Sequence, residues 1–91
     1  MTVMPSPAIR LARPDDAAAL SVVAAATFLE SYAGVIDGAA IVRHCRERHA
    51  EPVYAAAVAD AAQALHIAEI DPGAAPVGYT HLATPDLPVE T

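Results

Sequence analysis

The sequence predicts one small α+β unit, and three observations indicate it. A helical pattern of small residues follows Pro14-Asp15-Asp16, two stretches with strand alternation flank the turn signal Asp71-Pro72-Gly73, and 91 residues leave room for only one domain. We expect the folded part to cover residues 8–83, between a proline-containing leader at 1–7 and an aperiodic tail at 84–91.

The first expected element is a short strand at residues 8–12, and a helix that opens at Pro14 follows it. In the strand Ile9 and Leu11 fall on one side, which is the alternation of a half-buried strand. Proline suits the first helical position because its missing amide hydrogen would have no partner there, and Gly34 suits the position after the last turn. The inward face of this helix is expected to carry Ala17, Leu20, Ala24, Thr27, Phe28 and Ser31.

Two more helical segments and two strands are expected after Gly34. The second helix covers residues 38–49, with Asp37 as its cap and with Ile41, Val42 and Cys45 inward. A break at 50–52 precedes a third, alanine-rich helical segment at 53–60. Strands at 64–70 and 77–83 should then pair antiparallel across the turn.

The expected core is thin for a free-standing fold. Hydrophobic residues make up 55% of the chain, but alanine supplies much of this and aromatic residues only 4%, so little area is available for burial. The core is therefore expected to depend on a few larger side chains, namely Leu11, Leu20, Phe28, Leu29, Ile41, Leu65, Ile67, Ile70, Val77 and Leu82.

Charge and composition exclude several classes of function. The net charge of −6 disfavours nucleic-acid binding, which needs a basic stripe. The apolar run at 17–29 is too short to span a bilayer, and the acidic residues on both sides of it are unlike the flanks of a signal peptide. Cys45 is the only cysteine, which fits a reducing compartment. We therefore expect a cytoplasmic protein with neither a nucleic-acid nor a membrane partner.

The helix expected at 38–49 carries cysteine and histidine residues that could act as metal ligands. Cys45 and His49 are four residues apart and share a helical face, as two metal ligands would. The arginines around them repel a cation, so we interpret Cys45 as a core residue and His44 and His49 as surface histidines, and predict no metal site. The remaining His66 and His81 lie on strands and are interpreted as satisfied or solvent-facing, and Tyr32 and Tyr79 as pocket candidates or packed tyrosines.

Four stretches, in order, resemble the GNAT superfamily of N-acetyltransferases. The segment Ile9-Arg10-Leu11-Ala12-Arg13-Pro14-Asp15-Asp16-Ala17 resembles the first strand and the start of the first helix in that family. The segment Thr27-Phe28-Leu29-Glu30-Ser31-Tyr32-Ala33-Gly34 looks like the end of that helix in one branch. The segments Ala68-Glu69-Ile70-Asp71 and Pro76-Val77-Gly78-Tyr79 are similar to the second and third strands, so that the resemblance covers residues 8–88.

The sequence also departs from the family pattern. The family continues with a fourth strand and a (Gln/Arg)-x-x-Gly-x-(Gly/Ala) loop, whose backbone amides hold the pyrophosphate of acetyl-CoA, and this sequence stops at Thr91, where that strand would begin. The tyrosine that in the family often protonates the departing thiolate is absent. Arg13 occupies the position at which the family more often has a threonine that caps the first helix. The resemblance thus transfers no catalytic and no cofactor-binding residue. It transfers two acceptor-binding positions, Phe28 and Tyr32, at the end of the first helix.

The resemblance implies a three-stranded antiparallel sheet with two to three helices on one face, the N-terminal half of an acyl-CoA N-acyltransferase fold. Completed, such a fold transfers acetyl from acetyl-CoA to a small-molecule or peptide amine. This chain alone is expected to be an incomplete domain that is inactive and does not bind acetyl-CoA. The alternative is a non-catalytic binding or dimerisation module, since a half-fold exposes a strand edge and an apolar sheet face. The expected partner is a second copy or a missing C-terminal half.

Overall fold

The computed structural model describes residues 7–71 and 73–83, so the expected tail, nearly all of the leader and Pro72 of the turn lie outside the described residues. Strand β1 (Ala8–Leu11) leads into a 3₁₀ turn (Pro14–Asp16) and helix α1 (Ala17–Tyr32). Helices α2 (Gly38–Arg48) and α3 (Glu51–Ala59) follow, and then strands β2 (Gln63–Ile70) and β3 (Ala75–Ala83). This order of elements is the one that the sequence predicts.

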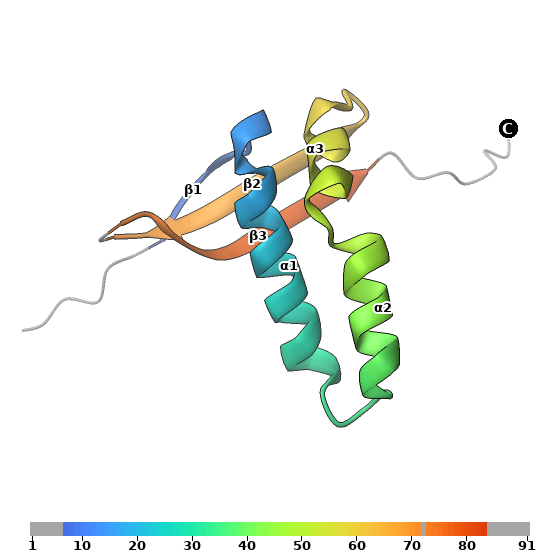
Figure 1. Cartoon of the computed structure of the whole chain (residues 1–91). Coiled ribbons are helices and arrows are strands. Elements are labelled where there is room, and N and C mark those ends of the chain that lie inside the picture. The colour runs from blue at the N-terminus through green and yellow to red at the C-terminus, as the bar shows by residue number, and fades with distance from the viewer. Residues whose placement is uncertain (1–6, 72, 84–91) are drawn as a thin grey trace, which may run out of the picture.

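The three strands form one antiparallel sheet in the order β1-β2-β3, which confirms the α+β class and the predicted hairpin. Ile67 lies opposite Arg10 on one side and Tyr79 on the other, whereas Ala68 lies opposite Ile9 and Gly78. Figure 1 shows α1 and α3 across one face of the sheet, while α2 lies beside the far end of α1 and away from the strands. Two helices therefore cover the sheet and the third extends from them.

The local signals at the helix ends act as predicted. Pro14 is the first residue of the 3₁₀ turn. The backbone amide of Arg13, the residue before it, donates to Asp16 Oδ2 at 2.6 Å, so the carboxylate of Asp16 satisfies a backbone group at the start of the turn. Gly34 has a φ of +81°, the left-handed conformation that favours glycine after a helix. Asp37 Oδ2 accepts from the amide of Ala39 at 3.1 Å and caps α2.

The core lies between the sheet and the first half of α1, together with α3. Leu20 and Ile67 are fully buried. The rest of the cluster is made of smaller residues and one tyrosine, namely Ala12, Ala17, Ala24, Tyr54, Ala57 and Leu65. Small side chains on α1 and α3 let both helices lie close to the sheet.

Several residues expected in the core are exposed. The second half of α1 runs past the sheet, so Thr27, Leu29 and Ser31 are exposed and Phe28 is only half-buried (Figure 1). On α2, Val42 faces solvent while Ile41 is buried. The predicted break between the second and third helices falls at residues 49–50 and not at 50–52, because α3 begins at Glu51 with Pro52 in its first turn, where proline costs no helical hydrogen bond.

Most of the other residues that were expected in the core but are exposed lie on the sheet face opposite the helices. Ile9, Leu11 and Leu82 share this face and are 70%, 62% and 66% exposed. We call it the open sheet face; Ala64, Ala68 and the half-buried Ile70 belong to it too. Val77, another expected core residue, is exposed at a β-bulge, where the pairing shifts between Ala68 and Glu69.

Candidate functional site

Aromatic and imidazole rings from four elements gather beside the second half of α1. Phe28 of α1 stacks on His44 of α2, with ring centroids 4.0 Å apart and an interplanar angle of 12°. Tyr32, one helical turn after Phe28, lies with its ring centroid 4.6 Å from that of Phe28. The helical spacing of four residues places these two rings on one face of α1, and α2 supplies the third ring.

His49 joins this group to α3. Its ring centroid lies 4.9 Å from that of His44 and 5.6 Å from that of Phe28. His49 Nδ1 lies 2.8 Å from the hydroxyl oxygen of Tyr54, and the backbone carbonyl of His49 accepts a hydrogen bond of 2.5 Å from the hydroxyl of Ser21. His49 is therefore held at both its backbone and its ring, at the junction between α2 and α3.

Tyr54 connects the rings to the sheet. Its side chain belongs to the buried core, and its ring lies edge-on to Tyr79 of β3 with centroids 6.1 Å apart. His81, two residues further along β3, lies 6.2 Å from Tyr54, and its Nε2 is 2.6 Å from Gln63 Oε1. The rings thus extend without interruption from the end of α1 to β3.

A cavity of about 380 Å³ opens among these rings, and we call it the ring-lined cavity. Among the described residues, no Asp, Glu, Lys or Arg side chain is part of its lining. The lining residues are Ala24, Thr27, Phe28, Ser31, Tyr32, His44, His49 and Tyr79. Its volume falls within the range of small-molecule sites, and its walls combine apolar rings with a few hydrogen-bonding groups, as in such sites.

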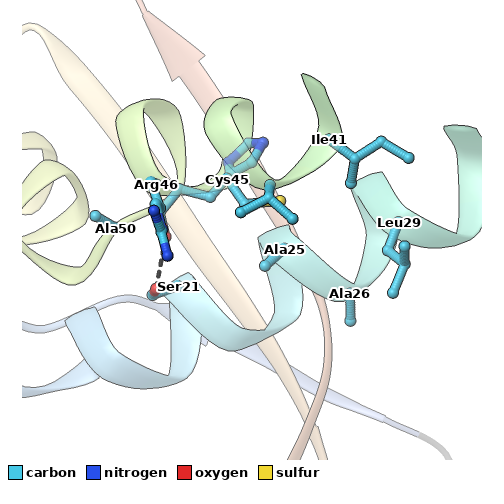
Figure 2. A pocket seen from close by; sticks show the side chains of 10 residues that line it. Ser21, Ala25, Ala26, Leu29, Ile41, Cys45, Arg46 and Ala50 are labelled. Atoms are coloured by element: carbon cyan, nitrogen blue, oxygen red, sulfur yellow. Dashed lines mark hydrogen bonds between the residues drawn. The ribbon is translucent and has the colours of Figure 1, made fainter. Parts of the chain in front are cut away.

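A second cavity, of about 530 Å³, lies between α1 and α2. Figure 2 shows residues that line it, with Ala25, Ala26 and Leu29 on α1, Ile41 and Cys45 on α2, and the hydrogen bond of Ser21 at one end. The walls are almost wholly apolar and carry one cation, Arg46. This groove contains the predicted inward Cys45, and its other polar lining residues are Ser21, Arg46 and His49, of which the Ser21 hydroxyl and the His49 carbonyl are hydrogen-bonded to each other.

The surroundings of the ring-lined cavity shift two pKa values. Burial, and then the neighbouring His44, lower the pKa of His49 below its usual 6.5. Burial also raises the pKa of the Tyr54 phenol well above 10, and Tyr79 adds to this effect. At neutral pH the site therefore holds an uncharged His49 beside an uncharged Tyr54.

The structure brings together the two acceptor-binding residues named from the sequence, since Phe28 and Tyr32 are in ring contact and line the same cavity. It corrects the interpretation of His44 and His49 as surface histidines, because both are partly buried in the ring cluster. Sequence reasoning missed Tyr54. Its only signal is that a large aromatic residue stands alone among the small residues of α3.

Within residues 7–71 and 73–83, no group of three or more His, Cys, Asp and Glu side chains could hold a metal ion. Over the same residues, no helix is both long and apolar enough to cross a membrane.

Comparison with protein-family models finds no match, and neither curated proteins nor solved structures show a significant similarity to this chain. The fold and the site together define an α+β protein with a ring-lined cavity between its helices and strand β3.

Proposed function

We propose that this chain forms the acceptor-binding half of a GNAT-type N-acetyltransferase, which transfers acetyl from acetyl-CoA to an amine. One observation carries the proposal: Phe28 and Tyr32, the two acceptor-binding positions that the resemblance transfers, meet in ring contact and line one cavity of small-molecule size. The element order supports it as well, because the strand, the helical segments and the hairpin follow one another as in the first half of that fold.

In this proposal the chain binds and orients the amine, and residues outside these 91 positions bind acetyl-CoA. The sequence contains no (Gln/Arg)-x-x-Gly-x-(Gly/Ala) segment, so no acetyl-CoA pyrophosphate site of the family type is assigned to it. The rings of Phe28 and Tyr32 would fix the position of the acceptor.

Amine binding tests this function directly. The ¹⁵N-labelled chain is titrated with primary amines, from ethanolamine to 2-phenylethylamine and 4-ethylaniline, and backbone amide shifts are followed by NMR. We expect at least one amine to shift residues that line the ring-lined cavity and to lose affinity in Phe28→Leu. Val22→Ala, an exposed position on the first half of α1, is the matched control. If no amine perturbs the cavity, the acceptor-binding function is refuted.

A second candidate is a non-catalytic binding or dimerisation module. The open sheet face favours it, because Ile9, Leu11 and Leu82 place large apolar side chains in water on one surface. Among the described strands, β3 also has no neighbour on its outer side, so its backbone groups are available to a further strand. A second copy of the chain or a separate C-terminal half would satisfy both features, and the state of association in solution tests this candidate.

A further inference from the structure

We propose that the ring-lined cavity takes an aromatic amine that is uncharged at neutral pH, and that His49 accepts a hydrogen bond from its amino group through Nε2. The inference rests on the proposed acceptor-binding function and names the chemical class of the acceptor. It depends on three features of the cavity: the absence of a carboxylate among its described lining residues, the arrangement of its rings, and the way in which His49 is held.

The first feature is that no carboxylate lines the cavity in the part of the chain that the structure describes. An alkylammonium ion entering the cavity would lose water without gaining an opposite charge, and an ion removed from water without a partner is strongly disfavoured. An amino group attached directly to an aromatic ring is far less basic, because its lone pair is delocalised into the ring, and it enters without charge. The lining therefore favours an arylamine over an alkylamine of the same size.

The second feature is the arrangement of the rings. The rings of Phe28 and His44 are nearly parallel, and the ring of Tyr32 is tilted by 36° to that of Phe28. Flat molecules extend such a group by offset stacking or by an edge-to-face contact. Space for one is left by small side chains of α1, because Ala24 and Thr27 line the same cavity.

The third feature is the orientation of His49. Its Nδ1 is engaged by the Tyr54 hydroxyl, and within the described residues Nε2 has no hydrogen-bond partner. This hydrogen bond between Nδ1 and Tyr54 can run in either direction, depending on the tautomer of His49. The proposal takes the tautomer in which Nδ1–H donates to the Tyr54 hydroxyl, so that the lone pair of His49 is on Nε2. In this state Nε2 can accept from an arylamine N–H, and it can take the proton that an amine loses on acylation.

Two isomers of one formula separate the classes of amine. 4-Ethylaniline is a neutral arylamine at neutral pH, whereas 2-phenylethylamine is an ammonium ion with the same atoms and a similar size. Each is titrated into the ¹⁵N-labelled chain at about pH 7.5, where His49 is neutral. We expect 4-ethylaniline to bind about tenfold more tightly or better, with amide shifts at the cavity. Equal or tighter binding of 2-phenylethylamine overturns the inference and leaves the acceptor-binding function in place. If neither isomer shifts the cavity residues, the inference is refuted, and so is an acceptor function for these two amines.

Variants of His49 test the contact to Nε2. His49→Gln should weaken 4-ethylaniline binding about fivefold or more, whereas His66→Gln, on the open sheet face, should leave it unchanged. Long-range ¹H–¹⁵N spectra of the histidine rings should show the proton of His49 on Nδ1 in the wild-type chain. Unchanged affinity in a folded His49→Gln variant, or a proton on Nε2 in the wild-type ring, overturns the proposed contact. Because these measurements need no acetyl transfer, the ligand class is decided separately from catalysis.

Discussion

Arg10 and Asp16 are joined by two parallel hydrogen bonds, from Nη1 to Oδ2 at 2.7 Å and from Nη2 to Oδ1 at 2.8 Å. The same guanidinium donates from Nε to Glu69 Oε1 at 2.9 Å. One side chain of β1 thereby ties the start of α1 to β2, and paired hydrogen bonds of this kind fix geometry as well as charge. The hydrogen bonds from Arg10 lower the pKa of Asp16 from 3.8 to about 2.

This pairing makes the stability of the fold sensitive to acid. Because the pKa of Asp16 is lower in the folded chain, its contribution is complete above about pH 4 and is lost as the pH falls towards about 2. Asp16→Asn should lower the free energy of unfolding by about 1–2 kcal/mol at neutral pH, allowing for the partial exposure of Arg10. Urea unfolding at neutral and acidic pH measures this difference, which should shrink in acid. The exposed neighbour gives the control, Asp15→Asn, and an equal loss in both variants would contradict the expectation.

Leu20 is expected to be the most costly position of α1. Both Leu20 and Phe28 were expected in the core, but Leu20 is 0% exposed against the sheet whereas Phe28 is half-buried at the edge of a cavity. Leu20→Ala should lower the free energy of unfolding by about 2–5 kcal/mol, and Phe28→Ala by less. Val22→Ala, at an exposed site, should change it by less than about 0.5 kcal/mol. Urea unfolding of the three variants gives the ranking, and a greater loss in Phe28→Ala would place the core elsewhere.

His49 should make the fold less stable in mild acid. Its pKa is lowered in the folded chain, so the unfolded chain binds more protons just below pH 6.5, and stability falls as the pH drops through that value. The loss ends once the pH is below the pKa of the folded state. The urea midpoint of the wild-type chain should therefore fall between neutral pH and mild acid, and that of His49→Gln should fall less. His66→Gln should keep the wild-type pH dependence; if it behaves like His49→Gln, the effect does not come from the ring cluster.

The 91-residue chain is expected neither to bind acetyl-CoA nor to transfer acetyl groups by itself. The physical reason is that no glycine-containing loop of the family pattern offers backbone amides to the pyrophosphate. Isothermal titration with acetyl-CoA should show no saturable heat. A dissociation constant in the micromolar range, about −8 kcal/mol of binding free energy, would contradict this expectation.

The chain is expected to associate in solution through its sheet. Pro76 interrupts only the beginning of β3, so the later part of that edge and the open sheet face are both available. Sedimentation equilibrium should show a species heavier than the 9.4 kDa monomer. Leu82→Lys should shift the equilibrium towards the monomer, whereas Val22→Lys, an equally exposed apolar residue on α1, should not. A single 9.4 kDa species with cooperative unfolding would refute association.

The sequence by itself determined the elements and their order. Proline at the first turn, Asp37 before α2 and Gly34 after α1 act through hydrogen bonds and backbone angles within a few residues, so their effects are readable along the chain. The alternation in β2 and β3 likewise predicted the hairpin.

Tertiary structure alone decided which faces those elements bury. Helical spacing predicted one continuous inward face for α1, but the second half of α1 runs past the sheet, so Leu20 entered the core and Phe28 did not. Only folding could bring His49 within 2.8 Å of Tyr54, or Tyr54 beside Tyr79. These contacts join residues of different elements, and no local periodicity or capping signal encodes the distance between them. The ring-lined cavity is therefore a product of helix packing, although two of its residues could be named in advance.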